Sequence, residues 1–233
     1  MFDVIIIGNE HFDEVFKQLT NELKISPDYI HEDVFSTHVQ VRITALKSIA
    51  FELKRKSISG AVAELGVFRG EFAKYINEMF PDRILHLFDT FEGFDERDVL
   101  KARELAGVEF SGDRNAVICT GHPGNTSEDL VLSKMRYPGN CRIHKGYFPE
   151  TTKSVNDEES YCFVNIDVDL YQPALHGLNY FYPRMSPGGV ILLHDYNVPV
   201  YLGVMKAFDR FLEIHSDAKY VPIGDNASVA IVR

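Results

Sequence analysis

Residues 60–70 read GAVAELGVFRG, which combines an apolar strand, a glycine turn and the start of a helix. The small and β-branched residues from Ala61 to Leu65 are typical of a strand that is buried on both faces. Gly66 and Gly70 allow a tight turn and a close approach of the backbone to a ligand. An acidic residue, Glu64, stands near the strand end. The stretch therefore predicts a βα unit whose carboxyl end faces a ligand.

The same alternation of strand and helix continues downstream. Further strands are predicted at Ile84–Phe88, Cys141–Tyr147, Cys162–Ile166 and Val190–Leu193. Such alternation indicates parallel βαβ units packed on both faces of one sheet, and Ser186–Gly189 is predicted as the turn before the last strand. Residues 220–232 instead predict two strands joined by a hairpin at 224–226. We predict an α/β, doubly wound, mostly parallel seven-stranded Rossmann-like sheet with an antiparallel C-terminal hairpin.

The first 59 residues do not follow this rhythm. Val4–Ile7 is predicted as a strand, and His11–Leu23 and residues 34–50 carry apolar residues at helical spacing. We therefore expect an N-terminal appendage at 1–59, acting as a cap or an interface, and one main domain at 60–233. Gly107–Gly124 is predicted as a loop or lid over the site, because it is rich in turn-forming residues.

Composition excludes several classes of protein. The 233 residues carry a net charge of -10, which argues against nucleic-acid binding, because that depends on clustered Lys and Arg. No apolar run reaches the roughly 20 residues of a membrane span, and the N-terminus has no basic signal region, so we expect a cytoplasmic protein. The cysteines, Cys119, Cys141 and Cys162, have no metal-type spacing and are expected to be reduced.

Asp89 follows the second strand of the main domain, 25 residues after Glu64. An acid at this place can accept both hydroxyls of a ribose, although a helix cap gives the same pattern. No phosphate-binding GxGxxG or GxxxxGK[ST] motif is present, and residues 8–11 match one poorly, which disfavours NAD and ATP. A nucleoside without phosphates fits better.

Four ionisable residues follow two further strands. Asp167 and Asp169 come directly after one strand, and His194 and Asp195 follow the next. Because neighbouring parallel strands end side by side, Asp167, His194 and Asp195 could bind one divalent ion. The structural alternatives are a cap for Asp169 and a core hydrogen bond for His194. Such clusters are more typical of functional sites.

Three blocks of residues together resemble one known family. They are Ala63–Gly70, Phe88–Phe94, and Ile166–Tyr171 followed by Tyr182–Tyr196. In combination and order they are similar to the macrocin O-methyltransferase family, the sugar O-methyltransferases of macrolide and aminocoumarin pathways. That family has the class I S-adenosylmethionine-dependent methyltransferase fold, so residues 60–233 are expected to form a methyltransferase domain.

The resemblance also implies roles for individual residues. The implied cofactor contacts are Glu64, Leu65, Gly66, Gly70, Asp89, Thr90, Phe91 and Asp167. A divalent metal, Mg or Mn, would be held by Asp167, His194 and Asp195. The family usually has two adjacent aspartates at 194 and 195, and imidazole is a poor ligand for magnesium. The site would then prefer manganese, iron or zinc, or it would bind no metal and use His194 as a base.

The predicted function is S-adenosylmethionine-dependent methylation of a hydroxyl on a small molecule, in particular a sugar or glycosylated metabolite. The catalytic candidates are Asp169 as general base, with His194 and His144 as alternatives. Two other functions remain open: a metal-dependent catechol-type O-methyltransferase, and a cofactor-binding subunit without turnover. The expected partners are a hydroxylated acceptor and further copies of the chain, with no nucleic acid and no membrane.

Overall fold

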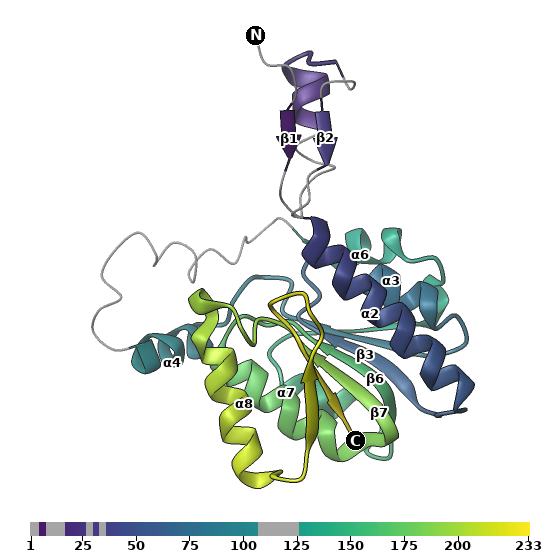
Figure 1. The fold of residues 1–233 in the computed structure, drawn as a ribbon, viewed down its shortest axis with the longest axis vertical. Helices are drawn as coiled ribbons and strands as arrows, with labels where there is room; N and C mark the ends of the chain where they lie inside the picture. Colours follow the sequence, from purple (N-terminus) through teal and green to yellow (C-terminus); the bar gives the residue numbers. More distant parts are fainter. Residues whose placement is uncertain (1–4, 8–16, 27–29, 33–35, 107–125) are drawn as a thin grey trace.

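The protein is described by a computed structural model that covers residues 5–7, 17–26, 30–32, 36–106 and 126–233 (Figure 1). Its main feature is a seven-stranded sheet with the order β5-β4-β3-β6-β7-β9-β8. The pairs among β3 to β7 are parallel, whereas β9 is antiparallel to both β7 and β8. This confirms the predicted doubly wound sheet with its antiparallel C-terminal hairpin.

The strands lie close to their predicted positions. They are β3 (Ala61–Leu65), β4 (Leu85–Asp89), β5 (Cys141–Lys145), β6 (Tyr161–Ile166), β7 (Met185–Leu193), β8 (Lys219–Pro222) and β9 (Val229–Val232). The helices are α2 (Ser36–Arg55), α3 (Ala73–Met79), α4 (Glu96–Ala106), α6 (Glu128–Lys134), α7 (Tyr171–Phe181) and α8 (Leu202–Ile214).

Helices cover both faces of the sheet. Figure 1 shows α2, α3 and α6 on one side and α7 and α8 on the other. Two separate hydrophobic cores result. The first lies under α7 and α8 and includes Phe88, Val164, Phe181, Phe208 and Phe211. The second lies under α2, α3 and α6 and includes Leu46, Leu53, Ile76, Leu87 and Val131. Burial on both faces explains why the central strands are almost wholly apolar.

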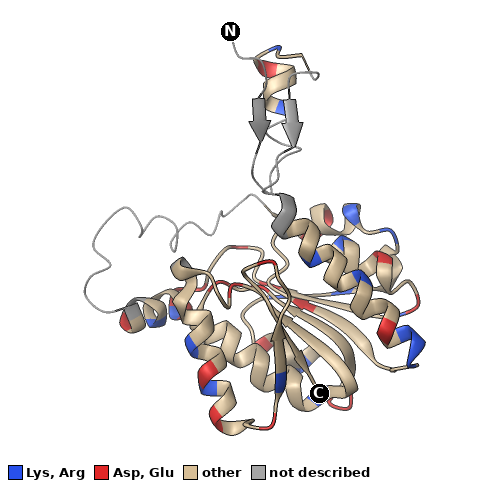
Figure 2. Cartoon of the chain, in the orientation of Figure 1, with Lys and Arg blue, Asp and Glu red and all other residues tan. Residues whose placement is uncertain are grey.

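Charged residues are arranged so that the sheet interior stays apolar. Strands β6 and β7 carry no Asp, Glu, Lys or Arg, and Figure 2 shows such residues mainly on helices and on the segments that connect them with strands. Within the strands of this sheet, acidic residues occur near the carboxyl ends, Glu64 in β3 and Asp89 in β4, and Asp167 and Asp195 follow the ends of β6 and β7. Polar side chains therefore meet at one edge, as expected for a ligand site in an open α/β sheet.

One predicted turn is instead part of a strand. Ser186–Gly189 lies within β7, between the pairs Tyr161 with Met185 and Phe163 with Val190. The register shifts between these pairs, so four residues of β7 face a single residue of β6. Ser-Pro-Gly-Gly thus forms a bulge that the strand spans, because pairing on both sides of it continues the sheet.

The N-terminal residues form a second, small sheet. Strand β1 (Ile5–Ile7) pairs in parallel with β2 (Ile30–Glu32), which had no sequence prediction. Of the predicted helix 11–23, residues 18–22 are helical, and its beginning lies outside the described residues, as do Cys119 and the predicted loop 107–124. Cys141 and Cys162 are unpaired and buried. Among the described residues, no helix is long and apolar enough to span a membrane.

Candidate active site at the strand ends

The glycine turn after β3 packs directly on the end of β6. Gly66 has φ +86°, and a Cβ added to it would lie 1.9 Å from the carbonyl oxygen of Asp167. The amide of Asp167 in turn donates to the carbonyl of Leu65, at 2.9 Å. Only glycine can occupy this place. The predicted cofactor turn and the predicted acidic cluster are therefore parts of one site.

Asp89 holds the glycine turn in place. Its Oδ2 accepts hydrogen bonds from the backbone amides of Val67 and Phe68, at 2.7 and 2.8 Å. Its Oδ1 accepts from the amide of Phe91, at 2.7 Å. Asp89 is not a helix cap, since α4 begins only at Glu96. With three of its roughly four acceptor positions in use, Asp89 fixes the turn and has one position left for a ligand.

Glu64 is buried beside this turn with one oxygen unpaired. Its side chain is 1% exposed. Its Oε1 accepts from Asn165 Nδ2 at 2.8 Å, while Oε2 has no hydrogen-bond partner among the described residues. Burial raises the pKa of Glu64 to about 8, although the charge of Arg42 opposes this. An unpaired buried oxygen is costly unless a ligand group satisfies it.

A buried arginine from α2 connects the acidic residues. Arg42 donates from one nitrogen to Asn165 Oδ1 at 2.9 Å and to Asp167 Oδ2 at 2.8 Å, and its guanidinium lies 4.2 Å from the ring centre of Phe72. Burial disfavours its charge, but Asp167 and the other nearby acids raise the pKa of Arg42. The same ion pair holds the pKa of Asp167 below its usual range despite burial.

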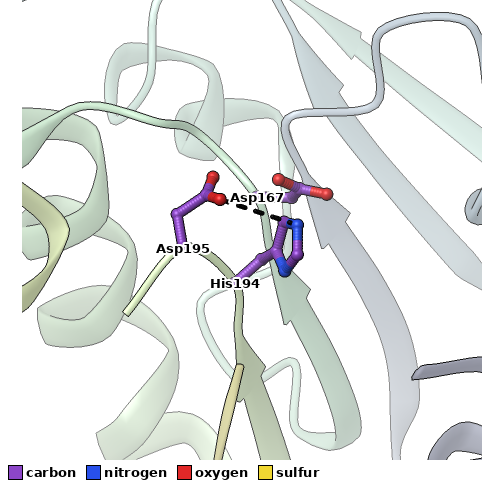
Figure 3. A group of neighbouring side chains, drawn as sticks. All are labelled: Asp167, His194 and Asp195. Carbon is purple, nitrogen blue, oxygen red and sulfur yellow. Dashed lines mark ion pairs between the residues drawn. The ribbon is translucent and has the colours of Figure 1, made fainter. Parts of the chain in front are cut away.

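Asp167, His194 and Asp195 come together as predicted. Each offers one ligand atom, and these atoms lie within 4.8 Å of one another. Figure 3 shows the imidazole beside the two carboxyl groups, with His194 Nε2 3.6 Å from Asp195 Oδ1. Burial, the nearby Asp167 and a hydrogen bond with Asp169 raise the pKa of Asp195 to about 10. Among the described residues, the buried Oδ2 atom of Asp195 has no hydrogen-bond partner, so a cation would relieve this carboxyl group.

The fourth predicted ionisable residue, Asp169, also reaches the cluster. It follows the end of β6 in a left-handed conformation, with φ +59°, and forms the side-chain hydrogen bond to Asp195 noted above. Asp195 has the same φ of +59°. Non-glycine residues in this region carry strain that is typical of functional sites. Asp169 is therefore a member of the cluster, and the N-cap of α7 is the next residue, Leu170.

His144 is placed elsewhere. It lies on β5, three strand spacings from β6 and thus on the order of 14 Å away. Both ring nitrogens are engaged, Nε2 with His86 Nδ1 at 2.9 Å and Nδ1 with Ser154 Oγ at 2.7 Å, and its ring stacks on Phe88. The structure therefore does not bring His144 to the acidic cluster, because its strand is at the far end of the parallel part of the sheet. Its surroundings are those of a core residue.

We expect His144→Gln to lower stability and to leave unchanged any activity that depends on the acidic cluster. The substitution disturbs the hydrogen bonds to His86 and Ser154, which should cost about 1 to 3 kcal/mol of unfolding free energy. Thermal unfolding and initial rates on one preparation measure both effects. A variant with normal stability and strongly reduced turnover would restore His144 as a catalytic candidate.

Sequence reasoning missed two residues of the site, Arg42 and Asn165. Arg42 stands one position before Ile43 and four before Leu46, so it shares the apolar side of its helix, which is an unusual place for a charge. Asn165 is the polar residue of an apolar strand and pairs in register with Glu64. Both signals are visible in the sequence but identify no partner.

Known proteins resemble the chain in sequence and in fold. The family model described as macrocin-O-methyltransferase matches residues 34–230. A curated relative, mycinamicin III 3''-O-methyltransferase of Micromonospora griseorubida, is 26% identical over 168 residues, which cover 68% of this chain and 63% of the relative. The chain thus matches less than two thirds of that relative's length.

Solved structures share the fold at lower identity. The O-methyltransferase NovP is 19% identical, with a TM-score of 0.69, and the match covers 96% of this chain and 98% of NovP. The calicheamicin methyltransferase CalS11 is 16% identical, with a TM-score of 0.67, covering 97% of this chain and 93% of CalS11. Because the family model matches most of its length, the chain belongs to the macrocin-O-methyltransferase family, as residues 63–70, 88–94, 166–171 and 182–196 predicted.

Proposed function

We propose that the protein transfers a methyl group from S-adenosylmethionine to a hydroxyl of a sugar or a glycosylated small molecule. The observation that carries the proposal is the contact between Gly66 and the backbone of Asp167. This contact places the glycine turn after β3, the predicted nucleoside-binding turn, beside the cluster of ionisable groups. The chain also belongs to a methyltransferase family. One ligand can therefore reach both.

The residues present fit S-adenosylmethionine. The unpaired Oε2 of Glu64 is a buried acceptor beside the glycine turn, suited to the ammonium group of the methionine part. Asp89 has one acceptor position left for a ribose hydroxyl. We assign the remaining predicted contacts to the same two loops: Leu65, Gly66, Gly70, Thr90 and Phe91.

In the proposed reaction, the acceptor hydroxyl oxygen attacks the methyl carbon in line with the breaking carbon–sulfur bond. A carbon–oxygen bond forms, the sulfonium becomes a neutral thioether, and the hydroxyl proton passes to the protein. Asp169 is the proposed base, since it lies in the cluster and at the site edge. Orientation of the two reactants can supply about 7 to 11 kcal/mol of such a barrier.

The cluster also fits a divalent cation. Asp167, His194 and Asp195 would hold it, and the unpaired Oδ2 and the raised pKa of Asp195 both indicate that a positive charge would be favourable there. A bound cation would lower the pKa of the acceptor hydroxyl. Without one, Arg42 is the positive group nearest to Asp167.

The proposed sugar acceptor rests on the relatives. The curated relative is named for methylation of mycinamicin III, and another structure of CalS11, with a TM-score of 0.59, describes a TDP-rhamnose 3'-O-methyltransferase. These names describe those proteins. For this chain they select the first acceptors to test, namely nucleotide-linked and glycosidically linked deoxysugars.

We also propose a revised boundary for the methyltransferase unit. Helix α2 places Leu46, Ala50 and Leu53 in the core and Arg42 in the site. The N-terminal appendage predicted for 1–59 would then end before Ser36, and residues 36–233 would form the methyltransferase unit.

Transfer of labelled methyl groups tests the proposed function. Wild type should methylate at least one deoxysugar nucleotide or glycoside in a panel that includes a catechol, and Asp169→Asn should lower kcat by about 100- to 10,000-fold, as expected for loss of a general base. Methylation of the catechol alone would instead favour the catechol-type alternative. Binding of the cofactor without any transfer would favour the non-catalytic subunit.

A further inference from the structure

A buried hydrogen-bond chain leads from the C-terminal hairpin to His194. Asp225 and Ser228 are each 1% exposed and lie between β8 and β9. Asp225 Oδ1 accepts from the backbone amides of Ala227 and Ser228, at 3.0 and 2.7 Å. Its Oδ2 accepts from Ser228 Oγ at 2.6 Å, and Ser228 Oγ lies 2.9 Å from His194 Nδ1.

The donors in this chain can be assigned by counting protons. The amides of Ala227 and Ser228 donate to Asp225, which accepts as a carboxylate. The Ser228 hydroxyl has one proton, and it is used in the hydrogen bond to Asp225. Ser228 Oγ is therefore the acceptor toward His194, and the ring proton of His194 is on Nδ1.

This assignment leaves the Nε2 lone pair of His194 free on the side of the acidic cluster. That atom lies 3.6 Å from Asp195 Oδ1, and His194 offers one ring nitrogen to the group of ligand atoms within 4.8 Å of one another. Histidines that bind metals almost always donate their other ring N–H to a protein group, which fixes both the tautomer and the ring orientation. Here Ser228 accepts the Nδ1–H of His194, and Asp225 holds Ser228 in place.

We propose that Asp225 and Ser228 are positioning residues that present His194 Nε2 as a nitrogen ligand, so that the cluster binds Mn²⁺ or a similar transition-metal ion in preference to Mg²⁺. Imidazole suits the transition metals, whereas Mg²⁺ prefers oxygen ligands. The proposal rests on the proposed function for its place in catalysis. The metal-binding claim itself is independent of turnover.

The substitution Asp225→Asn gives a sharp test, because it reverses the direction of the chain. The two backbone amides hold Oδ1 of residue 225, so the new amide NH₂ would face Ser228 and donate to its oxygen. Ser228 would then donate to His194 Nδ1, and the ring proton would move to Nε2. The four hydrogen bonds described above would be kept, yet the lone pair directed at the cluster would be lost.

The experiment is a calorimetric titration of Mn²⁺ and Mg²⁺ into the purified full chain and three variants. We expect wild type to bind Mn²⁺ at least about 10-fold more tightly than Mg²⁺. Ser228→Ala and Asp225→Asn should each weaken Mn²⁺ binding by about 10- to 100-fold, the usual effect of removing such an outer partner. Ser154→Ala is the matched control, since Ser154 forms an equivalent hydrogen bond to His144, and it should not change Mn²⁺ affinity.

A pulsed electron paramagnetic resonance spectrum adds a readout that general loss of stability does not mimic. Nitrogen modulation from an imidazole ligand should be present in the Mn²⁺ complex of wild type and Ser154→Ala, and lost in folded Asp225→Asn. Equal Mn²⁺ affinity and modulation in wild type and Asp225→Asn would overturn the positioning role. No preference for Mn²⁺ in wild type would overturn the nitrogen-ligand site. Titration of S-adenosylhomocysteine into the same samples shows separately whether the proposed function fails.

Discussion

Arg42→Met is expected to lower the free energy of unfolding by about 3 kcal/mol, because removal of the buried arginine leaves the partly buried carboxylate of Asp167 without its ion partner. Arg42 is 8% exposed and is hydrogen-bonded to both Asn165 and Asp167. Methionine has a similar length and an apolar stem, so the packing on Phe72 is largely kept while the charge is lost. Denaturant unfolding monitored by circular dichroism measures the change.

The same substitution should also weaken ligand binding at the site. Without Arg42, Asp167 loses the ion pair that favours its ionised form, so we expect weaker binding of S-adenosylhomocysteine in the folded variant. Arg55→Met is the matched control, because Arg55 lies on the same helix in an exposed ion pair with Glu52. It should leave both quantities almost unchanged. A loss below about 1 kcal/mol for Arg42→Met would show that this ion pair contributes no more than an exposed one.

Gly66→Ala is the second substitution with a large expected effect. The new Cβ would lie 1.9 Å from the carbonyl oxygen of Asp167, and φ of +86° is strained for alanine. Backbone strain and overpacking together should cost about 3 to 5 kcal/mol. Because the obstacle is backbone, the turn must move, and S-adenosylhomocysteine binding should fall with stability.

Substitutions at two other glycines distinguish backbone strain from steric overlap as the cause of the stability loss. Gly224 has φ +84° but open space around an added Cβ, so Gly224→Ala should cost only about 1 kcal/mol. Gly139 has neither a positive φ nor a close neighbour, and Gly139→Ala should change stability by less than about 0.5 kcal/mol. Equal losses at Gly66 and Gly224 would mean that the contact with Asp167 is not a tight one.

Much of the fold could be predicted from sequence because its signals are local. Apolar runs that alternate with segments of helical periodicity predicted the parallel strands. The two apolar runs within residues 220–232 predicted the antiparallel hairpin. Because neighbouring parallel strands end side by side, their order along the chain also predicted that Asp167, His194 and Asp195 lie together. The prediction of a turn at Ser186–Gly189 was wrong. Such residues form either a bulge within a strand or a chain reversal, and pairing with a neighbouring strand decides which of the two occurs.

The predictions that could not be made all depend on long-range contacts. Arg42 lies 125 positions from Asp167, and nothing local to either residue identifies the other. The same holds for Ser228 and His194, which are 34 positions apart. His144 was included because its strand end is polar, but strand order, which places β5 at the edge of the sheet, separates it from the cluster.

Calorimetric titration of S-adenosylmethionine and S-adenosylhomocysteine into wild type and Asp89→Ala tests the central claim, that the glycine turn after β3 is a cofactor site. We predict micromolar binding of both ligands to wild type. Asp89→Ala should bind at least about 10-fold more weakly, because the amides of Val67, Phe68 and Phe91 lose the side-chain oxygens to which they donate, and the turn is released. Absence of binding to folded wild type, or equal affinity in Asp89→Ala, would contradict the account.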